Sequence, residues 1–198
     1  CIKCGARIIV STPREDIGAS MLIAEDLSPN VNVPVEVVPM EELEKGLSNS
    51  NHGTIVTSRY FLQPLEKVAK QYGVRAIAVD LSDFQKELDI IKELNTGSCV
   101  GIVSISPGLL RAAEVIIHSM RGGELIIMTA ISDNNSRLLS LLKASNQIVC
   151  DGPSLSVVEN TLLKNRSQLI RLPEIICAKN YLSIETINHL KKEIGVIN

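Results

Sequence analysis

The chain has 198 residues, of which 45% are hydrophobic and 21% charged, a composition typical of a globular protein with one domain or one domain of two lobes. Its 20 basic and 22 acidic residues give a formal net charge of −2, and its aromatic residues are three Tyr and two Phe. This balance excludes nucleic-acid binding through a basic face or an aromatic platform. No apolar run reaches the length of a membrane span and no signal peptide is visible, so we expect a cytoplasmic protein without membrane contact.

Short apolar strands followed by helices make up the first half of the chain. We expect strands at residues 7–10, 35–38, 54–56 and 74–79. The helices between and after them are expected at residues 13–27, 41–47, 60–72 and 82–94. Pro13 suits the first position of its helix, with Ser11 or Thr12 as the cap, because the missing N–H of proline costs nothing there.

Residues 97–133 show this alternation most clearly. A strand at 99–103 is followed by a hydroxyl-rich turn at 104–108, a helix that ends at two glycines, and a strand at 125–130. Strands that are apolar throughout suit a parallel sheet covered on both faces. The apolar residues of the helix recur at three- and four-residue spacing, and we expect these to face the sheet: Leu109, Ala113, Ile116, Ile117 and Met120.

The last two strands are expected at 148–150 and 175–177, and helices are expected around 138–142, up to 163, and after Ser183. Eight strands that alternate with helices predict the α/β class with mostly parallel sheets. One doubly wound sheet and two lobes both fit this pattern. We favour a single effector-type domain over 1–198, with lobe I at about 1–80 plus 175–198 and lobe II at about 81–174. This is the layout of periplasmic-binding-protein-like sensor domains, and the preference rests partly on that analogy.

Most of the predicted strands end in a hydroxyl residue or an aspartate. In open α/β sheets, ligands bind beyond the carboxyl ends of the strands, where helix N-termini offer N–H groups to anions. We therefore predict that a small anionic or polar ligand binds between the lobes, at Ser11, Thr12, Arg14, Thr57, Ser58, Arg59, Asp80, Ser104 and Ser106. The alternative is that these residues only cap helices, because hydroxyl and aspartate side chains are what a helix N-terminus requires in any case.

The signals for catalysis are weak. The phosphate-binding, dinucleotide-binding, nucleophile-elbow and zinc-protease motifs are all absent from the sequence. The three histidines, His52, His118 and His189, fall in a polar turn or on helices, where a solvated or packing role is expected. We expect no enzyme and no cofactor. The alternative is a transferase-type enzyme or a solute-binding protein that uses the same cleft, with Asp80 or Asp151 as the base.

The chain has five cysteines and begins with Cys1 rather than Met, so we expect it to be part of a longer polypeptide. Cys1 and Cys4 form a C-x-x-C pair without further ligands at zinc spacing, and we expect no metal there. A redox or intersubunit thiol at this pair stays open. The other three cysteines lie in expected strands, where Cys behaves as a small apolar residue.

A stripe on the last helix is a candidate for dimerisation. Its members recur at three- to four-residue spacing: Ile184, Ile187, Leu190 and Ile194. The alternative is that this stripe packs on its own lobe.

Four stretches of the sequence, at residues 7–20, 35–43, 54–61 and 97–104, resemble the C-terminal effector and dimerisation domain of cyanobacterial GntR-family transcription regulators of the PlmA-like group. The resemblance spans nearly the whole chain. It implies a regulatory domain that senses an effector or partner and forms a homodimer, and a winged helix-turn-helix upstream that reads DNA and is absent from this chain. It also implies a cytoplasmic interaction with the nitrogen-signalling protein PII, bridged by PipX. No DNA-reading residue of the family has a counterpart here.

Overall fold

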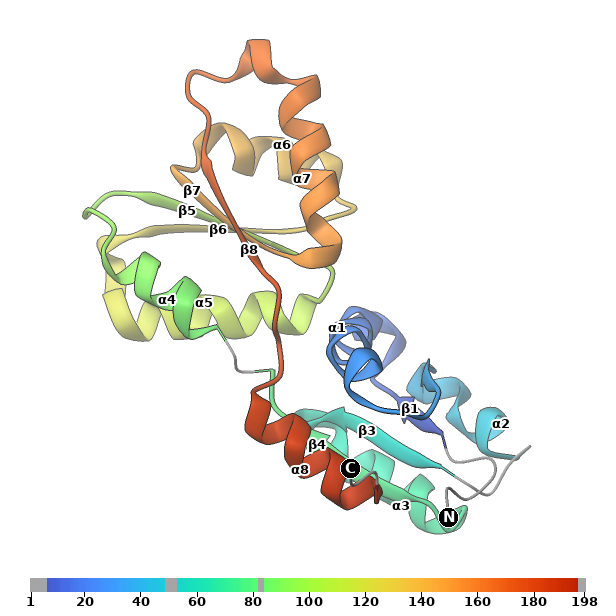
Figure 1. Cartoon of the computed structure of the whole chain (residues 1–198). Coiled ribbons are helices and arrows are strands. Elements are labelled where there is room, and N and C mark those ends of the chain that lie inside the picture. Colours follow the sequence, from blue (N-terminus) through green and yellow to red (C-terminus); the bar gives the residue numbers. More distant parts are fainter. Residues whose placement is uncertain (1–6, 49–52, 82–83, 196–198) are drawn as a thin grey trace. The chain divides into compact units, whose positions relative to one another are not determined.

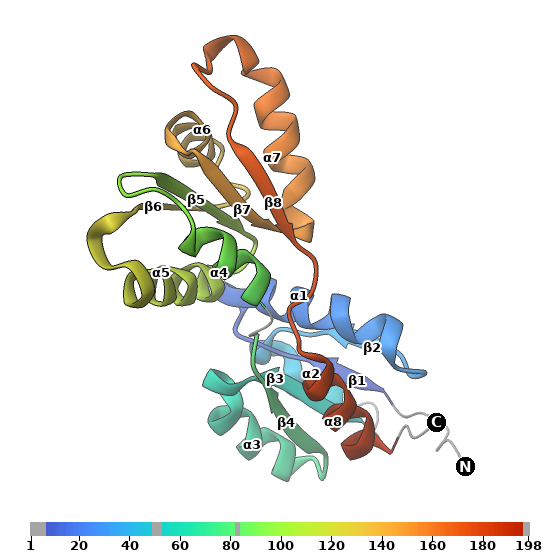
Figure 2. The same cartoon turned by 60° about the vertical axis from the view of Figure 1, so that its left-hand side comes forward.

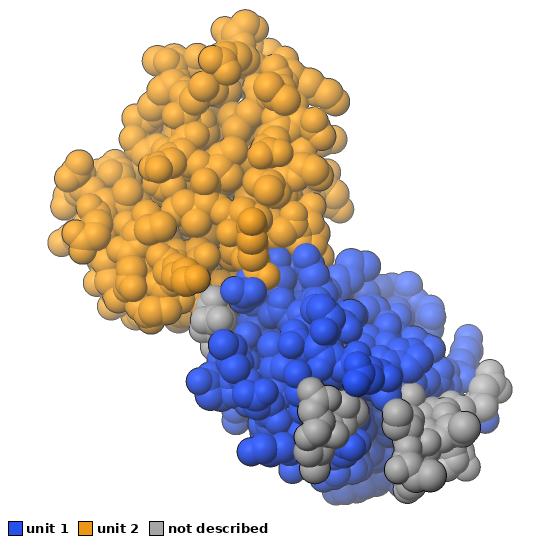
Figure 3. Space-filling view, viewed as in Figure 1, with its two compact units in different colours: residues 1–83, 180–198 blue, residues 84–179 orange. Residues whose placement is uncertain are grey.

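The computed structural model of the chain describes residues 7–48, 53–81 and 84–195. It divides into two compact units, unit 1 with residues 1–83 and 180–198 and unit 2 with residues 84–179 (Figure 3). In the described part of the chain, each unit has one four-stranded sheet in which all neighbouring strands are parallel. None of the helices in these described ranges is long and apolar enough to cross a membrane.

Unit 1 has the strand order β2-β1-β3-β4. Its strands are β1 (Ile8–Val10), β2 (Val35–Val37), β3 (Thr54–Ser58) and β4 (Arg75–Val79). Its α-helices are α1 (Ile17–Leu27), α2 (Leu43–Ser48), α3 (Leu62–Gln71) and α8 (Ile184–Ile194). Short 3-10 helices are η1 (Arg14–Asp16), η2 (Ser28–Asn30), η3 (Met40–Glu42) and η4 (Arg59–Phe61).

The helices of unit 1 cover both faces of its sheet. Val10 and its register partner Val56 pack in a cluster with residues of α1 and α8. Ile9 and its register partner Ile55 point to the opposite face and pack in a cluster with residues of α2 and α3. Because both faces are covered, the central strand β1 is apolar on both sides, whereas the edge strand β2 carries the exposed Glu36 between two valines.

Unit 2 has the strand order β6-β5-β7-β8. Its strands are β5 (Cys99–Ser104), β6 (Ile126–Ile131), β7 (Gln147–Asp151) and β8 (Glu174–Ala178). Its α-helices are α4 (Gln85–Lys92), α5 (Pro107–Arg121), α6 (Asn135–Ala144) and α7 (Gly152–Lys164), and its 3-10 helices are η5 (Gly122–Glu124) and η6 (Arg166–Gln168). Figure 1 shows α6 and α7 on one side of this sheet and α4 and α5 on the other, and Figure 2 shows α7 running along β8.

The two sheets share one topology. In each, the second strand pairs with one side of the first, and the third and fourth strands follow on its other side. The chain therefore leaves the first strand through a helix on one face (α1 or α5) and the third strand through a helix on the opposite face (α3 or α7). The point between the first and third strands is where ligands bind in sheets of this kind.

The α/β class and the mostly parallel sheets predicted from the sequence are confirmed, as are all eight strands. The predicted inward stripe of α5 is partly wrong. Leu110 and Ile117 are buried against the sheet, whereas Ile116 is 39% exposed. Both Leu109–Ile116 and Leu110–Ile117 are seven residues apart, so the helical period alone does not choose between them, and the position of the sheet does.

The boundary predicted near residue 174 is also wrong. Residues 175–179 were assigned to lobe I, but β8 pairs with β7, with Ile175 opposite Ile148 and Cys177 opposite Cys150. The chain returns to unit 1 only after Lys179. The backbone groups of these residues need a neighbouring strand, and β7 provides it in unit 2. Whether the two units work as one effector domain stays a prediction.

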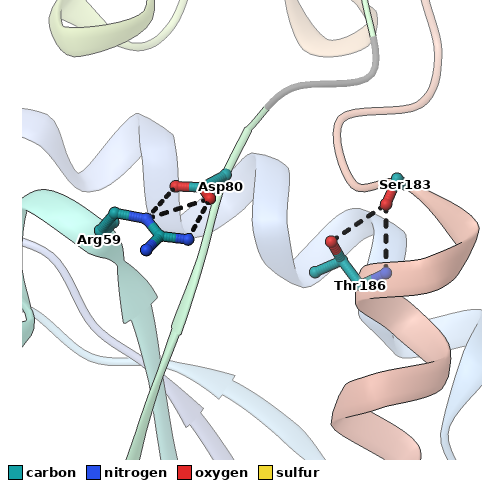
Figure 4. Close-up of polar contacts among 4 residues, drawn as sticks. All are labelled: Arg59, Asp80, Ser183 and Thr186. Carbon is teal, nitrogen blue, oxygen red and sulfur yellow. Dashed lines mark hydrogen bonds and ion pairs between the residues drawn. The ribbon is translucent and has the colours of Figure 1, made fainter.

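The returning chain is fixed on unit 1 by a buried carboxylate. Asp26, in α1, accepts hydrogen bonds from Tyr181 N (2.6 Å) and Leu182 N (2.7 Å). Both of these residues are buried, and Leu182 belongs to the same core cluster as α1. Ser183 then caps α8 by accepting from Thr186 N at 3.1 Å (Figure 4). The start of α8 is thus determined by contacts with unit 1.

We expect Gly101→Ala to destabilise unit 2 by about 1–3 kcal/mol, because a Cβ atom there would overlap the Leu141 side chain and lie 2.6 Å from Ser145 Oγ. Urea unfolding followed by circular dichroism measures the change. Gly123→Ala is the control, since a Cβ at Gly123 meets no atom within 4 Å. Equal unfolding midpoints for the two variants would contradict the close packing of β5 against α6.

Candidate functional site

Four hydroxyl residues lie at the carboxyl ends of β1 and β3, at the switch point of unit 1. Val10 is opposite Val56, and Ser11 N donates to Val56 O at 2.9 Å, so the ladder continues and places Ser11 opposite Thr57. Thr12 and Ser58 are the next residues along the two chains. We call residues 11–16, 38–45, 57–61 and 80–81 the unit 1 edge.

Three of these hydroxyl groups are buried without a hydrogen-bond partner among the described residues: those of Ser11, Thr57 and Ser58. A buried hydroxyl that makes no hydrogen bond costs about 1–3 kcal/mol. By the alternation of the strands, Ser11 and Thr57 lie side by side on the α2 and α3 face of the sheet, and Ser58 lies on the α1 and α8 face. Unpartnered groups of this kind are unusual in a folded protein, where nearly all buried polar groups are paired. The unit 1 edge therefore has unused hydrogen-bonding capacity that a bound molecule can satisfy.

The hydroxyl of Thr12, in contrast, has hydrogen-bond partners within unit 1. Its hydroxyl donates to the carbonyl oxygen of Asp16 at 2.7 Å and lies 2.8 Å from the hydroxyl of Ser20 in α1. These bonds hold the first turn of the chain after β1. Thr12 is thus a structural residue of the unit 1 edge.

Arg14 is engaged by two glutamates that follow β2. Its backbone N–H donates to both carboxylate oxygens of Glu41, at 3.2 and 3.1 Å, and its guanidinium forms an ion pair with Glu42. Hydrogen bonds from the backbone N–H groups of Glu41 and Arg14 lower the pKa of Glu41. A carboxylate of the chain itself therefore occupies a backbone N–H at the start of η1.

Arg59 and Asp80 form an ion pair between the ends of β3 and β4 (Figure 4). Arg59 Nε donates to Asp80 Oδ1 at 2.9 Å, and Arg59 Nη2 donates to Oδ2 at 2.6 Å. These hydrogen bonds and the positive charge of Arg59 hold the pKa of Asp80 below its ordinary value of 3.8. Both side chains are largely exposed, so the pair contributes little to stability.

The carboxyl end of the unit 2 sheet is organised around one buried carboxylate. Asp151, opposite Ser104 in the extended register, accepts from Ser104 Oγ (2.6 Å), Ile105 N (2.8 Å) and Ser154 N (2.9 Å). Ser106 is buried and caps α5 by accepting from Leu109 N at 3.0 Å. The switch point of unit 2 thus already holds an anion, supplied by the protein. Of the polar side chains here, only Ser154 is buried with an unpartnered hydroxyl among the described residues.

The structure divides the predicted ligand residues between two edges. Ser104 and Ser106 lie in unit 2. The other seven lie in unit 1: Ser11, Thr12, Arg14, Thr57, Ser58, Arg59 and Asp80. Sequence reasoning missed the part played by Glu41 and Glu42, which reach Arg14 from η3, the 3-10 helix that follows β2. No local pattern indicates such a contact between residues 27 positions apart. Ligand binding by any of these residues stays a prediction.

Three members of the predicted dimerisation stripe pack on unit 1 itself. Leu190 is fully buried in the core cluster with α1, and Ile187 and Ile194 pack against that cluster. Ile184 differs, because 72% of it is exposed. A dimer contact through α8 stays a prediction, and it would depend on Ile184.

The cysteines and histidines form no cluster with a further ligand that could hold a metal in the part of the chain that the structure describes. Cys1, Cys4 and His52 lie outside the described residues. Cys150 and Cys177 are opposite each other on β7 and β8, and burial, with the neighbouring Cys177, raises the pKa of Cys150 to about 12. Cys150 is therefore a thiol at neutral pH, not a nucleophilic thiolate.

We expect Asp151→Asn to lower the free energy of unfolding by about 2–3 kcal/mol, because the amide offers one acceptor where three donors converge. Chemical unfolding measures this loss. Asp133→Asn is the control, as Asp133 is exposed, and it should change stability by less than about 0.5 kcal/mol. A loss of the same small size in both variants would show that the Asp151 carboxylate does not organise this end of the sheet.

We expect Arg59→Gln to raise the pKa of Asp80 back to its ordinary value or slightly above, since partial burial remains once the ion pair is gone. In the wild type, the pair stabilises the fold above the ordinary carboxyl pKa, and this small contribution is lost as pH falls through the lowered pKa. An NMR titration of the carboxyl groups measures both values. The pKa of Asp89, which Lys92 and Gln85 lower, should not move. If the pKa of Asp80 is the same in Arg59→Gln as in the wild type, the ion pair does not form in solution.

Comparison with known proteins adds one finding for unit 2. Residues 86–179 match the family model described as the cyanobacterial PlmA-type GntR regulator, C-terminal domain. This confirms the resemblance seen in the sequence for just under half of the chain, all of it in unit 2. Of the four stretches on which the resemblance was based, residues 97–104 lie inside the match and the other three lie outside it. No curated protein matches the chain.

Proposed function

We propose that this chain is the effector-sensing and dimerising module of a transcription regulator, because residues 86–179 match the model of the C-terminal domain of cyanobacterial PlmA-type GntR regulators. The family match is the observation that carries the proposal. DNA binding would be the task of another domain, which fits the formal charge of −2 on this chain. A cytoplasmic location belongs to the same proposal, since such a regulator acts where DNA is.

We place the effector at the unit 1 edge. The support is the set of buried hydroxyl groups without partners at Ser11, Thr57 and Ser58, which lie at the switch point of a parallel sheet. The equivalent point of unit 2 supports a structural role instead, because Asp151 already satisfies the donors there. An effector acts on a regulator only if it binds two conformations with different affinity. We propose that the two units serve as the lobes of a periplasmic-binding-protein-like sensor for this purpose.

The proposal extends to protein partners. A homodimer would use the exposed Ile184 at the start of α8. The family resemblance adds PII bridged by PipX as a partner complex. An enzyme or a solute-binding protein is the alternative function, but Asp80 is bonded to Arg59 and Asp151 to three donors of its own unit. Neither carboxylate is placed as a general base, so no observation favours this alternative.

We expect Ile184→Glu to weaken dimerisation at least tenfold, because the substitution places a charge in an apolar contact. Light scattering and sedimentation over a range of concentrations measure the mass of the full chain. Ile170→Glu is the matched control, since Ile170 is a fully exposed isoleucine of unit 2. A wild type that is monomeric at every concentration would contradict the dimer, and a folded Ile184→Glu variant with wild-type mass would exclude α8 as the contact.

A further inference from the structure

We infer that the unit 1 edge recognises a hydroxylated ligand that carries an ammonium group, and not the anion that strand-end hydroxyls and arginines indicate at first sight. This rests on the proposed function, because it takes the same edge as the effector site. The inference combines four observations: hydroxyl groups without partners, arginines that are already in ion pairs, a negative formal charge of the edge, and an exposed tyrosine.

The hydroxyl groups define the polar part of the ligand. Ser11 and Thr57 are register neighbours at the ends of β1 and β3, on one face of the sheet, and Ser58, the next residue of β3, lies on the other face. All three hydroxyl oxygens are buried and without a partner among the described residues. A hydroxyl group both donates and accepts, so the neighbouring hydroxyls of Ser11 and Thr57 suit a ligand with hydroxyl or ammonium hydrogens and oxygen acceptors.

The positive groups that would bind an anion are already engaged by the protein. The Arg59 guanidinium is bonded to Asp80, and the Arg14 guanidinium is bonded to Glu42. The Arg14 backbone N–H, at the start of η1, is occupied by Glu41. An anionic ligand would have to displace a carboxylate at each of these points, whereas a cationic or neutral ligand would not.

The charge of the unit 1 edge favours a cation. Its residues include three basic side chains, Arg14, Lys45 and Arg59, and six acidic ones, Glu15, Asp16, Glu41, Glu42, Glu44 and Asp80. The difference, 3 − 6, is a formal charge of −3, larger than that of the whole chain. A concentration of negative charge at one edge raises the local concentration of cations and repels anions.

Tyr60 offers an aromatic ring for a cation–π contact. It lies in η4, directly after Ser58 and Arg59, and 86% of it is exposed. An ammonium group over an aromatic ring gains about 0.5–1 kcal/mol at an exposed site. The edge therefore offers hydroxyl groups for the polar part of a ligand, and an exposed aromatic ring in a region of net negative charge for its cationic part.

Three pyranose sugars that differ in charge test the inference on the full chain: glucosamine, glucose and glucuronate. Each is titrated into labelled protein at about pH 6, where the amine is protonated, and the backbone amide shifts are followed by NMR. We expect the largest shifts at Ser11, Thr57 and Ser58, and an affinity for glucosamine at least fivefold above that for glucose, with glucuronate weakest. Glucuronate binding as tightly as glucosamine at these residues would overturn the inference and leave the effector site in place.

Variants separate charge from shape. Asp80→Asn should release Arg59, reduce the preference for glucosamine and increase the affinity for glucuronate. Asp89→Asn is the matched control, because Asp89 is also paired, with Lys92, but lies in unit 2. An unchanged preference in Asp80→Asn would overturn the electrostatic argument. If no sugar shifts the amides of the unit 1 edge, the hydroxyl groups hold water only, and the effector site itself falls together with the inference.

Discussion

Parallel pairing of strands is the constraint on which the rest of this structure depends. Two neighbouring parallel strands cannot be joined by a hairpin. Each strand is therefore followed by a crossover connection that returns the chain to the opposite end of the sheet. In both units, the carboxyl ends of all four strands therefore meet at one edge. Residues as far apart in the chain as Ser11 and Thr57 become neighbours for this reason.

The two edges solve the same physical problem in different ways. Polar groups at the end of a buried strand must be satisfied, because no strand continues there to pair with them. In unit 2, Asp151 collects a side-chain hydroxyl and two backbone amides around one carboxylate. In unit 1, the place opposite Ser11 holds Thr57, and neither hydroxyl finds a partner among the described residues. We interpret the first edge as structural and the second as available for binding.

The sequence predicted the strands well because each is a short apolar run bounded by turn residues. Caps followed from the same local rule at Ser106 and Ser183, which stand directly before their helices and accept a backbone N–H three residues on. The cap predicted at Ser11 or Thr12 is wrong, because α1 begins only at Ile17 and neither hydroxyl accepts a backbone N–H of its first turn. Prediction from the sequence failed where two neighbouring residues were equally apolar and either could face the sheet. Ile116 and Ile117 are adjacent apolar residues of α5, and only the neighbouring sheet decides that Ile117 is buried. The assignment of residues 175–179 failed because a strand does not indicate which sheet it joins.

The sequence by itself determined the class of the protein, its alternation of strand and helix, and the placing of hydroxyl residues where the strands end. These follow from periodicity and from capping, which act over a few residues. Only the tertiary structure decided that Glu41 and Glu42 engage Arg14, that Asp80 engages Arg59, and that Asp151 fills the switch point of unit 2. Those pairings join residues 21 to 47 positions apart, and strand order, which local sequence does not encode, brings them together.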